Sequence, residues 1–401
     1  MPILLEDTEL RAWIRLTLEP DLGAGRIHRL LSVFSLPHNI YTASTSNLAR
    51  YLDPGLAARL RQAPAANLQQ TIDDTVRWLD HPQHHLLTLA DPLYPATLLQ
   101  LEDSPPVLYA HGQPSVLARP MLAIVGARSA TPEGERNAYD FAEYLARHGW
   151  CVVSGLAAGI DGAAHRGALA AGPGKGSTLA ILGTGIDRVY PASHRALAHE
   201  ITGQGLMLSE FPLGTQGLKY HFPRRNRLVA ALGQGVLVVE AATHSGSLIT
   251  ARLAGELGRE VFAIPGSIHS PLSKGCHALI RQGAKLVESG QDILEELSQT
   301  SLSGIPAASS SRADTPASTS QTLTQTGASG SSTNTSSPPA ADTAPDPDTE
   351  VLLRALGYEP KNIDALQAHT QWPLDHLTGQ LTLLEMRGLL SRLPDGRYQR
   401  R

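Results

Sequence analysis

Residues 236–266 read VLVVEAATHSGSLITARLAGELGREVFAIPG, and this stretch decides the fold. Two apolar runs, 236–241 and 260–266, lie on either side of a helical pattern, TARLAGELGR. Because neither run alternates with polar residues, each is typical of a strand buried on both faces, as in a parallel sheet covered by helices. The stretch therefore predicts a strand–helix–strand unit, with the small residues of THSG between the first strand and the helix.

The same alternation continues through the neighbouring sequence. Further β-rich apolar runs occupy residues 121–126, 151–155, 177–183 and 206–210, with a weaker run at 285–288. Helical patterns such as EGERNAYDFAEYLARHG separate them. Strand–helix alternation over about 175 residues predicts an α/β fold, a doubly wound and mainly parallel sheet.

Smaller units are expected on both sides of this sheet, since 401 residues are too many for one ordinary core. Residues 1–75 carry short helical patterns around PDLGAG, which fits either a helix–hairpin–helix element or a plain helical bundle. The proline-rich residues 81–120 are expected to form a connecting segment laid on the sheet. The last fifty or so residues predict three helices and a hairpin with an Asp-Gly turn, the winged-helix plan. Seven bases against five acids from Val351 onward leave both DNA contact and protein docking open for this module.

A disordered tether is predicted at residues 299–349, which are rich in Ser, Thr, Ala and Pro. Between Thr300 and Glu350 there are five acids and one base, a sum of −4 that equals the net charge of the whole chain. The rest of the chain is therefore neutral, and the overall acidity does not argue against an anionic ligand. Two cysteines, no signal-peptide pattern and no apolar run of about 18 residues predict a cytoplasmic protein without a membrane span.

The candidate ligand site lies at the carboxyl ends of the predicted parallel strands, where open α/β sheets bind ligands. Ser245, Gly246, Ser247 and Thr250 open a predicted helix and are expected to cradle a phosphate with the amides of its first turn. The loops contain neither a G-x-G-x-x-G fingerprint nor a P-loop, so no dinucleotide or triphosphate cofactor is expected.

A cluster of positive charge, KYHFPRRNR at residues 219–227, precedes the strand at 236. Arg224, Arg225 and Arg227 open a predicted helix, where cations oppose the helix dipole. They need either an anionic ligand or ion pairs with Glu210 or Glu240. Together with two aromatic side chains, they favour single-stranded nucleic acid, which offers phosphates and flat bases at once.

Catalytic and metal sites have weaker signals. Asp161 and His165 share one helix face, but a third metal ligand is missing, and a local hydrogen bond explains the pair equally well. Asp187 and His194 form no recognisable triad. The sequence lacks a G-x-S-x-G elbow, a Cys–His pair and a zinc knuckle, so no catalytic residue, metal or cofactor is predicted.

Several blocks of the sequence resemble the DprA/Smf DNA-processing family. They are AIVGARSATPEG, VVSGLAAGIDGAAHRGAL, AILGTGIDRVYP, LSEFP, FPRRNRLVAAL, the 236–266 stretch and GCHALIRQGAKLV. The resemblance runs in order from about residue 85 to 297. It implies an extended Rossmann-like domain that binds single-stranded DNA without hydrolysing it. Members of this family protect incoming DNA during natural transformation and load RecA recombinase onto it.

The resemblance also implies a domain plan and partners. The division is 1–75 for a sterile-alpha-motif-like helical domain, 81–298 for the Rossmann-like domain, 299–349 for the linker and 350–401 for the winged helix. The expected partners are single-stranded DNA, RecA and a second copy of the chain, since many members dimerise through the Rossmann-like domain. The helix at 276–283 is a candidate dimer surface.

DNA-binding residues follow from the loops, from the basic cluster and from the family's motifs. The full set is Gly126, Arg128, Ser129, Ser154, Gly155, Arg195, Lys219, Phe222, Arg224, Arg225, Asn226, Arg227, Ser245, Gly246, Ser247 and Thr250. One departure is His194-Arg195, where the family often has Asn-Lys after its Tyr-Pro. The competing hypothesis is a nucleoside monophosphate phosphoribohydrolase of the lysine-decarboxylase-like type, but the glutamate of that motif is missing after SGSLIT.

Overall fold

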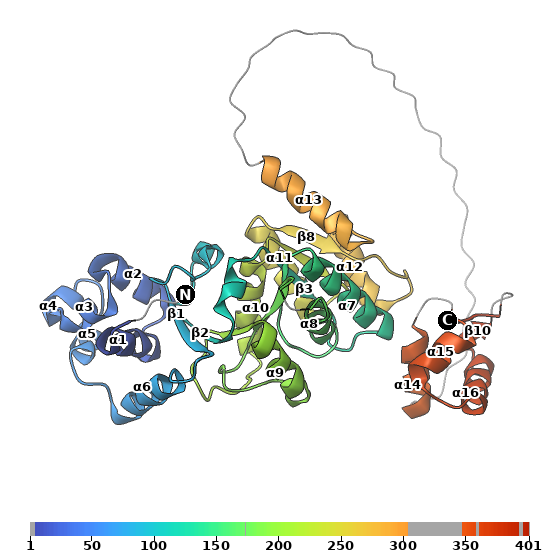
Figure 1. Cartoon of the computed structure of the whole chain (residues 1–401), viewed down its shortest axis with the longest axis horizontal. Coiled ribbons are helices and arrows are strands. Elements are labelled where there is room, and N and C mark those ends of the chain that lie inside the picture. Colours follow the sequence, from blue (N-terminus) through green and yellow to red (C-terminus); the bar gives the residue numbers. More distant parts are fainter. Residues whose placement is uncertain (1–4, 173, 304–346, 358–360, 393–395, 401) are drawn as a thin grey trace, which may run out of the picture.

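The computed structural model describes residues 5–172, 174–303, 347–357, 361–392 and 396–400, and its centre is a nine-stranded sheet (Figure 1). The strand order is β1-β2-β6-β5-β4-β3-β7-β8-β9. The strands β3 to β9 are all parallel to one another, and β1 and β2 add an antiparallel edge next to β6. The strands are β1 (His84–Thr88), β2 (Val107–Gly112), β3 (Met121–Val125), β4 (Cys151–Ser154), β5 (Ser177–Ile181), β6 (Leu206–Ser209), β7 (Gly235–Val238), β8 (Glu260–Ala263) and β9 (Lys285–Leu286).

Helices cover both faces of this sheet, as the unbroken apolar runs predict. In β3, Leu122 and Ile124 pack toward one layer of helices, while Ala123 and Val125 pack toward the other. The first layer contains α7 (Pro132–Arg147), α8 (Ile160–Ala170), α9 (Arg195–Gln204) and α13 (Gly290–Ser303). The second contains α10 (His221–Leu232), α11 (Gly246–Glu256) and α12 (Lys274–Arg281). The doubly wound α/β fold is therefore confirmed.

The strand order changes direction between β3 and β7, which are hydrogen-bonded neighbours. From β3 the chain winds outward through β4, β5 and β6, and from β7 it winds the other way through β8 and β9. The loops that follow β3 and β7 consequently leave toward opposite faces and open a crevice at the carboxyl ends of the strands. This crevice is the topological position at which a ligand is expected.

The proline-rich segment 81–120 was predicted to be a connecting segment on the sheet, but part of it belongs to the sheet itself. Its β1 and β2 pair with each other in antiparallel fashion and extend the sheet beyond β6. The prolines fall before, between and after these two strands, where they cost no ladder hydrogen bond. Between the prolines, the buried runs Leu86–Thr88 and Val107–Ala110 need partners for their backbone groups, and the edge of β6 supplies them.

The N-terminal residues form a small helical domain with an apolar core of its own, on the side of β1 and β2 in Figure 1. The turn at PDLGAG joins its first two helices. The helices are α1 (Asp7–Leu18), α2 (Ala24–Phe34), α3 (Pro37–Thr42), α4 (Thr45–Leu48), α5 (Pro54–Leu60) and α6 (Ala66–Trp78). None of the described helices of the chain is long and apolar enough to cross a membrane.

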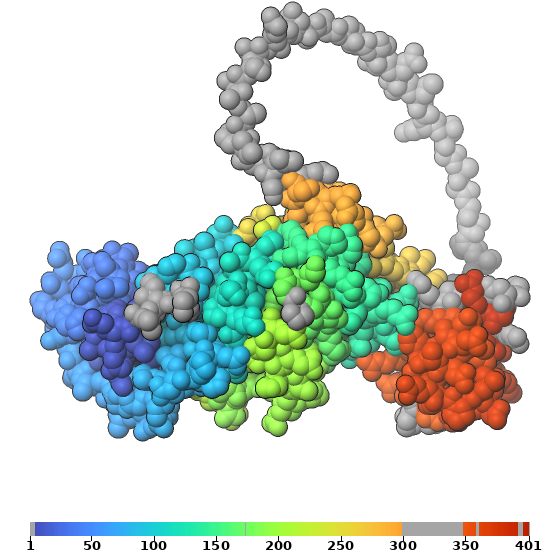
Figure 2. Space-filling model, in the orientation of Figure 1, coloured from blue at the N-terminus to red at the C-terminus, as the bar shows by residue number. Residues whose placement is uncertain are grey.

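The C-terminal module has the predicted winged-helix plan. Three helices, α14 (Pro347–Leu356), α15 (Ile363–Thr370) and α16 (Leu374–Met386), precede the antiparallel strands β10 (Leu390–Arg392) and β11 (Tyr398–Arg400). It lies beside the sheet domain (Figure 2), where Arg354 donates to the carbonyl oxygen of Ala130 at 3.3 Å. Most of the predicted tether lies outside the described residues, but 299–303 continue α13 and 347–349 begin α14.

Candidate nucleic-acid interface

A pocket of about 540 Å³ occupies the crevice between the loops after β3 and β7. Its walls come from those two loops, from the first two turns of α10 and α11, and from the start of α8. The predicted site residues that line it are Gly126, Arg128, Ser129, Arg225, Asn226, Ser245, Gly246, Ser247 and Thr250. Residues more than a hundred positions apart therefore meet at one opening.

The loop after β3 contributes a glycine without space for a side chain and an exposed arginine. A Cβ at Gly126 would lie 2.5 Å from Cγ1 of Ile160 and 3.0 Å from the carbonyl oxygen of Glu240, so only glycine fits there. Arg128 is exposed, and its guanidinium carbon lies 5.4 Å from the ring centroid of Phe222. Arg128 is thus held over an aromatic face at the mouth of the pocket.

The first turn of α11 forms another wall of the pocket. Ser245 caps the helix, and its hydroxyl accepts a hydrogen bond from the backbone N–H of Ser247 at 3.3 Å. A Cβ at Gly246 would meet no atom within 4 Å, so the backbone there is open to close approach by a ligand. The helix N-terminus offers amide donors and the positive end of the dipole, as an anion site requires.

Arg225 is a nearly buried cation in the pocket wall, with only 4% of its surface exposed. Its Nη1 donates to the carbonyl oxygen of Ile181 at 2.8 Å, and its Nε has no hydrogen-bond partner within the described structure. Burial lowers the pKa of Arg225 below its usual range, although the nearby Asp161 carboxylate favours the charged form. None of the described carboxylates lies within ion-pair distance of it. A buried guanidinium with this few partners is suited to meet an anion.

Asp161 and His165 serve the local structure around the pocket. The Asp161 carboxylate accepts hydrogen bonds from the backbone N–H groups of Gly155 and Ala157 at 3.1 and 3.3 Å, and burial raises its pKa. His165 Nδ1 lies 2.6 Å from the Thr178 hydroxyl, and burial lowers the pKa of His165 to about 3. The two side chains therefore hold the loop before α8 and the helix itself against β5.

Arg227 corrects the expectation that every arginine of the cluster faces a ligand. Its Nη2 lies 2.6 Å from the Glu210 carboxylate and its Nε lies 3.0 Å from Asp103. Arg224 shares the same Glu210 oxygen at 3.0 Å but keeps 54% of its side chain exposed. The side chain of Glu210 is only 2% exposed, so the pair with Arg227 neutralises a buried carboxylate and fixes α10 to the end of β6. The ion pair with Glu210, predicted as the alternative, is what the structure contains.

Ser154 also differs from its expected role. It is fully buried, and its hydroxyl donates to the carbonyl oxygen of Ile124 at 2.7 Å, so it joins β4 to β3 instead of lining the pocket. Gly155 lies next to it and is in direct contact with the Arg225 guanidinium, which fills the space that a side chain would need.

The remaining predicted residues do not line the pocket. Lys219 is exposed just before α10, and Arg195 is exposed at the start of α9. Phe222 is half-buried under Arg128. His194 replaces the asparagine expected from the resemblance, and its Nδ1 donates to the carbonyl oxygen of Leu156 at 3.0 Å. His194 therefore fixes the backbone at Leu156, in the loop before α8.

Sequence reasoning missed part of the pocket. Ala242, Thr243 and His244 line it because they follow β7 at the switch point. The rule that ligands bind beyond the carboxyl ends of strands could have identified them, since the preceding apolar run was recognised. Leu272 comes from a distant turn and has no local signal.

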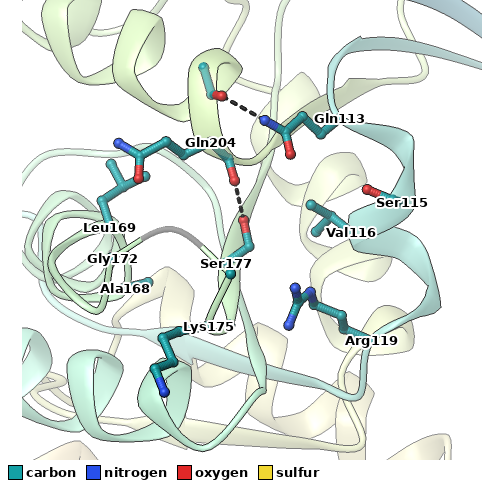
Figure 3. A pocket seen from close by; sticks show the side chains of 13 residues that line it. Gln113, Ser115, Val116, Arg119, Ala168, Leu169, Gly172, Lys175, Ser177 and Gln204 are labelled. Atoms are coloured by element: carbon teal, nitrogen blue, oxygen red, sulfur yellow. Dashed lines mark hydrogen bonds between the residues drawn. The ribbon is translucent and has the colours of Figure 1, made fainter.

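A second cavity of about 270 Å³ lies at the opposite, amino-terminal edge of the parallel strands (Figure 3). Arg119 and Lys175 are the basic residues of its lining, and Gln113 and Ser177 donate hydrogen bonds to carbonyls of Gly203 and Gln204. The C-terminal ends of α8 and α9 face this cavity and bring the partial negative charge of their helix dipoles to it. These helix ends disfavour an anion, so the switch-point pocket is the better candidate.

Among the described residues, no group of three or more His, Cys, Asp and Glu side chains could hold a metal ion. The groups at the switch-point pocket are guanidinium groups, backbone amides, hydroxyls, the Asp161 carboxylate and the His244 imidazole, with the aromatic face of Phe222 beside Arg128. Guanidinium, amide and hydroxyl groups bind phosphates, and aromatic faces stack on flat ligands.

Two family models match the chain. The model for DNA recombination-mediator protein A matches residues 85–298, and the model for the DprA winged helix domain matches residues 336–396. Protein Smf of Escherichia coli strain K12 is 37% identical over 392 residues, which covers 97% of this chain and 95% of that protein. DNA processing protein DprA of Streptococcus pneumoniae is 45% identical over 225 residues, which covers 56% of this chain and 78% of that protein.

Solved structures agree with these matches. The X-ray structure of DprA from Streptococcus pneumoniae covers 73% of this chain and 99% of its own, with a TM-score of 0.62 and 36% identity. DNA processing protein A from Helicobacter pylori, whose structure concerns a single-stranded DNA binding mode, covers 55% of this chain and 98% of its own, with a TM-score of 0.50 and 31% identity.

Proposed function

Because this chain belongs to the DprA/Smf family of DNA-processing proteins, we propose that it binds single-stranded DNA in the switch-point pocket and does so without catalysis. The phosphates would meet Arg128, Arg225 and the amides at the start of α11, while a base would stack on Phe222. Lys219 and Arg195 would add positive charge on the approach to the pocket. Arg224, which keeps half of its side chain exposed beside Glu210, is proposed as a peripheral contact.

The main support for this proposal is the burial of Arg225, which is only 4% exposed and makes one hydrogen bond in the described structure. Removing a charged guanidinium from water costs free energy of folding, and an anionic ligand would compensate part of that cost. A phosphodiester in the pocket would supply the missing negative charge. Because a neutral sugar or an apolar ligand would leave this cation unpaired, the site favours an anion.

The wider role follows the family. We propose that the protein protects incoming DNA during natural transformation, loads RecA onto it and acts as a homodimer through the Rossmann-like domain, with 276–283 as part of the contact. The division at 1–75, 81–298, 299–349 and 350–401 is proposed with it. A cytoplasmic location is consistent with two cysteines, Cys151 and Cys276, that are buried and unpaired.

The test is binding of fluorescent oligo-dT and of a matched duplex across a salt series. We expect wild type to prefer the single strand, with affinity that falls steeply as salt rises because phosphate contacts release counterions. The Arg128→Ala/Arg225→Ala double variant should lose at least 10-fold in affinity and show a shallower salt dependence. The Arg128→Ala single variant keeps the test valid if loss of the buried Arg225 impairs folding.

The matched control is the Arg77→Ala/Arg147→Ala double variant, which removes the same charge from exposed helix positions in α6 and α7. It should bind like wild type. Equal binding by the pocket variants and the control would show that the arginines have structural roles only. Hydrolysis of a nucleoside monophosphate to free base would instead support the phosphoribohydrolase.

A further inference from the structure

Three flat side-chain groups stand in sequence along one edge of the pocket. The Arg128 guanidinium carbon lies 5.4 Å from the Phe222 ring centroid, and the Phe222 and Tyr190 ring centroids lie 5.3 Å apart. The three residues come from the loop after β3, the first turn of α10 and the loop between β5 and α9. The similar separations make a continuous surface, Arg128–Phe222–Tyr190, which we call the aromatic platform.

The platform is held in place by its surroundings. A Cβ at Gly183 would lie 2.9 Å from Cδ1 of Phe222, and one at Gly217 would lie 3.5 Å from Cζ of Phe222 and 3.6 Å from Cγ of Tyr190. The phenyl ring therefore rests close to two glycine backbones, and Gly183 leaves no room for a side chain beside it. Such rings lose little further freedom when a ligand stacks on them.

The loop that carries Tyr190 is fixed by its own hydrogen bonds. The Thr184 hydroxyl donates to the carbonyl oxygen of Arg188 at 2.6 Å, and the Arg188 N–H donates to the carbonyl oxygen of Gly185 at 3.0 Å. Asp187 accepts the N–H of Gly214 at 2.9 Å, which ties this loop to the one before α10. Tyr190 is thus presented on an ordered loop.

Tyr190 is also accessible, with 54% of its surface exposed. Arg188 and Arg195 are exposed on either side of it in the sequence, so two further cations belong to the same stretch of chain. Proteins bind single-stranded nucleic acid with exposed aromatic rings next to basic side chains, since bases stack on the rings and phosphates contact the cations.

The angle between the two rings bears on what can bind. Their planes are inclined by 43° and their centroids are 5.3 Å apart. Bases within a B-form strand are parallel and about 3.4 Å apart. Two successive bases that follow both rings must therefore be pulled apart and tilted, which a base-paired and stacked duplex resists.

From this geometry we infer that Tyr190 is a second base-stacking residue, which receives the nucleotide next to the one on Phe222, and that the platform selects single strands over duplex. The inference rests on the proposed function, because it extends the same site by one nucleotide. It assigns the pocket to phosphate contact and the platform to base separation.

The experiment compares full-length wild type, Tyr190→Ala and Tyr190→Phe in binding to oligo-dT and to duplex across salt. Tyr190→Ala should weaken single-strand binding by about 5- to 150-fold, the size of one lost stacking contact, and leave the salt slope unchanged. Tyr190→Phe should restore affinity to within about 2-fold, since it keeps the ring. Duplex binding should not change, so the preference for single strands should fall by the same factor.

Tyr51→Ala is the matched control, because Tyr51 lies in the N-terminal helical domain, where its ring meets Phe34 edge to face, and it does not line the pocket. It should change affinity by less than about 3-fold. An oligonucleotide series with one abasic position at a time adds a direct readout. Wild type should be sensitive at two adjacent positions, and Tyr190→Ala at one.

The outcomes separate the inference from the function on which it rests. If wild type binds oligo-dT and Arg128→Ala weakens it, but Tyr190→Ala binds like wild type, the stacking role of Tyr190 is refuted and the proposed function stands. A reduced salt slope in Tyr190→Ala would also refute it, because stacking alters no phosphate contact. If wild type does not bind oligo-dT, both are refuted.

Discussion

Replacing Gly155 by alanine tests how Arg225 is seated. A Cβ at this position would fall within van der Waals contact of the guanidinium atoms Cζ, Nη1 and Nη2 of Arg225. The backbone of Gly155 is not among those with positive φ, so alanine is allowed there in every other respect. The substitution therefore acts first on Arg225, whose guanidinium atoms are the three nearest to the new Cβ.

The cost follows from what Arg225 must give up. To make room for a methyl group, the guanidinium has to withdraw by about 2 Å, which breaks its hydrogen bond to the Ile181 carbonyl. A hydrogen bond to a charged group contributes about 1.5–3 kcal/mol, and overpacking costs about 1–3 kcal/mol. We expect Gly155→Ala to lower the free energy of unfolding by about 3 kcal/mol and to weaken oligo-dT binding at least 10-fold.

The assay is urea denaturation at pH 7.5 for the variants in a double-mutant cycle. In an Arg225→Ala background the added cost of Gly155→Ala should drop below about 0.5 kcal/mol, because the clashing group is gone. Gly246→Ala, in the same pocket but with no atom within 4 Å of the new Cβ, should stay within about 0.5 kcal/mol of wild type. An equal cost of Gly155→Ala in both backgrounds would refute the reasoning.

Three further outcomes are expected. Arg227→Ala leaves the buried Glu210 carboxylate with the exposed Arg224 as its ion-pair partner and should lower the free energy of unfolding by about 3–5 kcal/mol. Arg224→Ala should lower it by less than about 1 kcal/mol, because Arg224 is exposed. Urea denaturation of both variants checks this, and equal costs would contradict it. Burial lowers the pKa of His165 to about 3, so the folded protein keeps this side chain neutral, while the unfolded chain binds a proton below about pH 6.5. The free energy of unfolding therefore falls as the pH drops from about 6.5 toward 3, by about 2 kcal/mol at pH 5. His165→Asn, which keeps a donor for the Thr178 hydroxyl, should flatten this pH dependence of the urea midpoint, and an unchanged slope would contradict it. A chain ending at Ser303 should keep oligo-dT affinity within about 3-fold, because all residues that line the pocket lie between Val125 and Leu272, and a complete loss would move the function to the winged helix.

The sequence was most informative about the sheet. Strands such as β3 and β7 are apolar without interruption because both of their faces are buried, and this signal is local and strong. The antiparallel strands β1 and β2 were missed because nearby prolines and histidines mask their short apolar runs. Their pairing depends on the free edge of β6, which is a long-range property.

The loops and the helix cap around the pocket were predictable, but the contacts of the individual arginines were not. The loops after β3 and β7 and the cap at Ser245 follow from the position of small residues beyond strand ends. Which arginine faces the pocket does not, because Arg225 and Arg227 are two residues apart and on different sides of α10. One lies under Gly155 and the other against Glu210. Only the three-dimensional neighbours decide whether a cation meets a ligand or a carboxylate.

The burial of Arg225 has a consequence for how the protein can evolve a higher melting temperature. A methionine of similar volume at position 225 would avoid the desolvation of a charge and would be expected to raise the melting temperature. Under the proposed function, selection for heat resistance alone would favour replacing this arginine, and each such gain would remove the counter-charge of the proposed phosphate. Thermal adaptation within the lineage would therefore have to come from elsewhere in the molecule, and position 225 marks where selection for stability and selection for activity oppose each other.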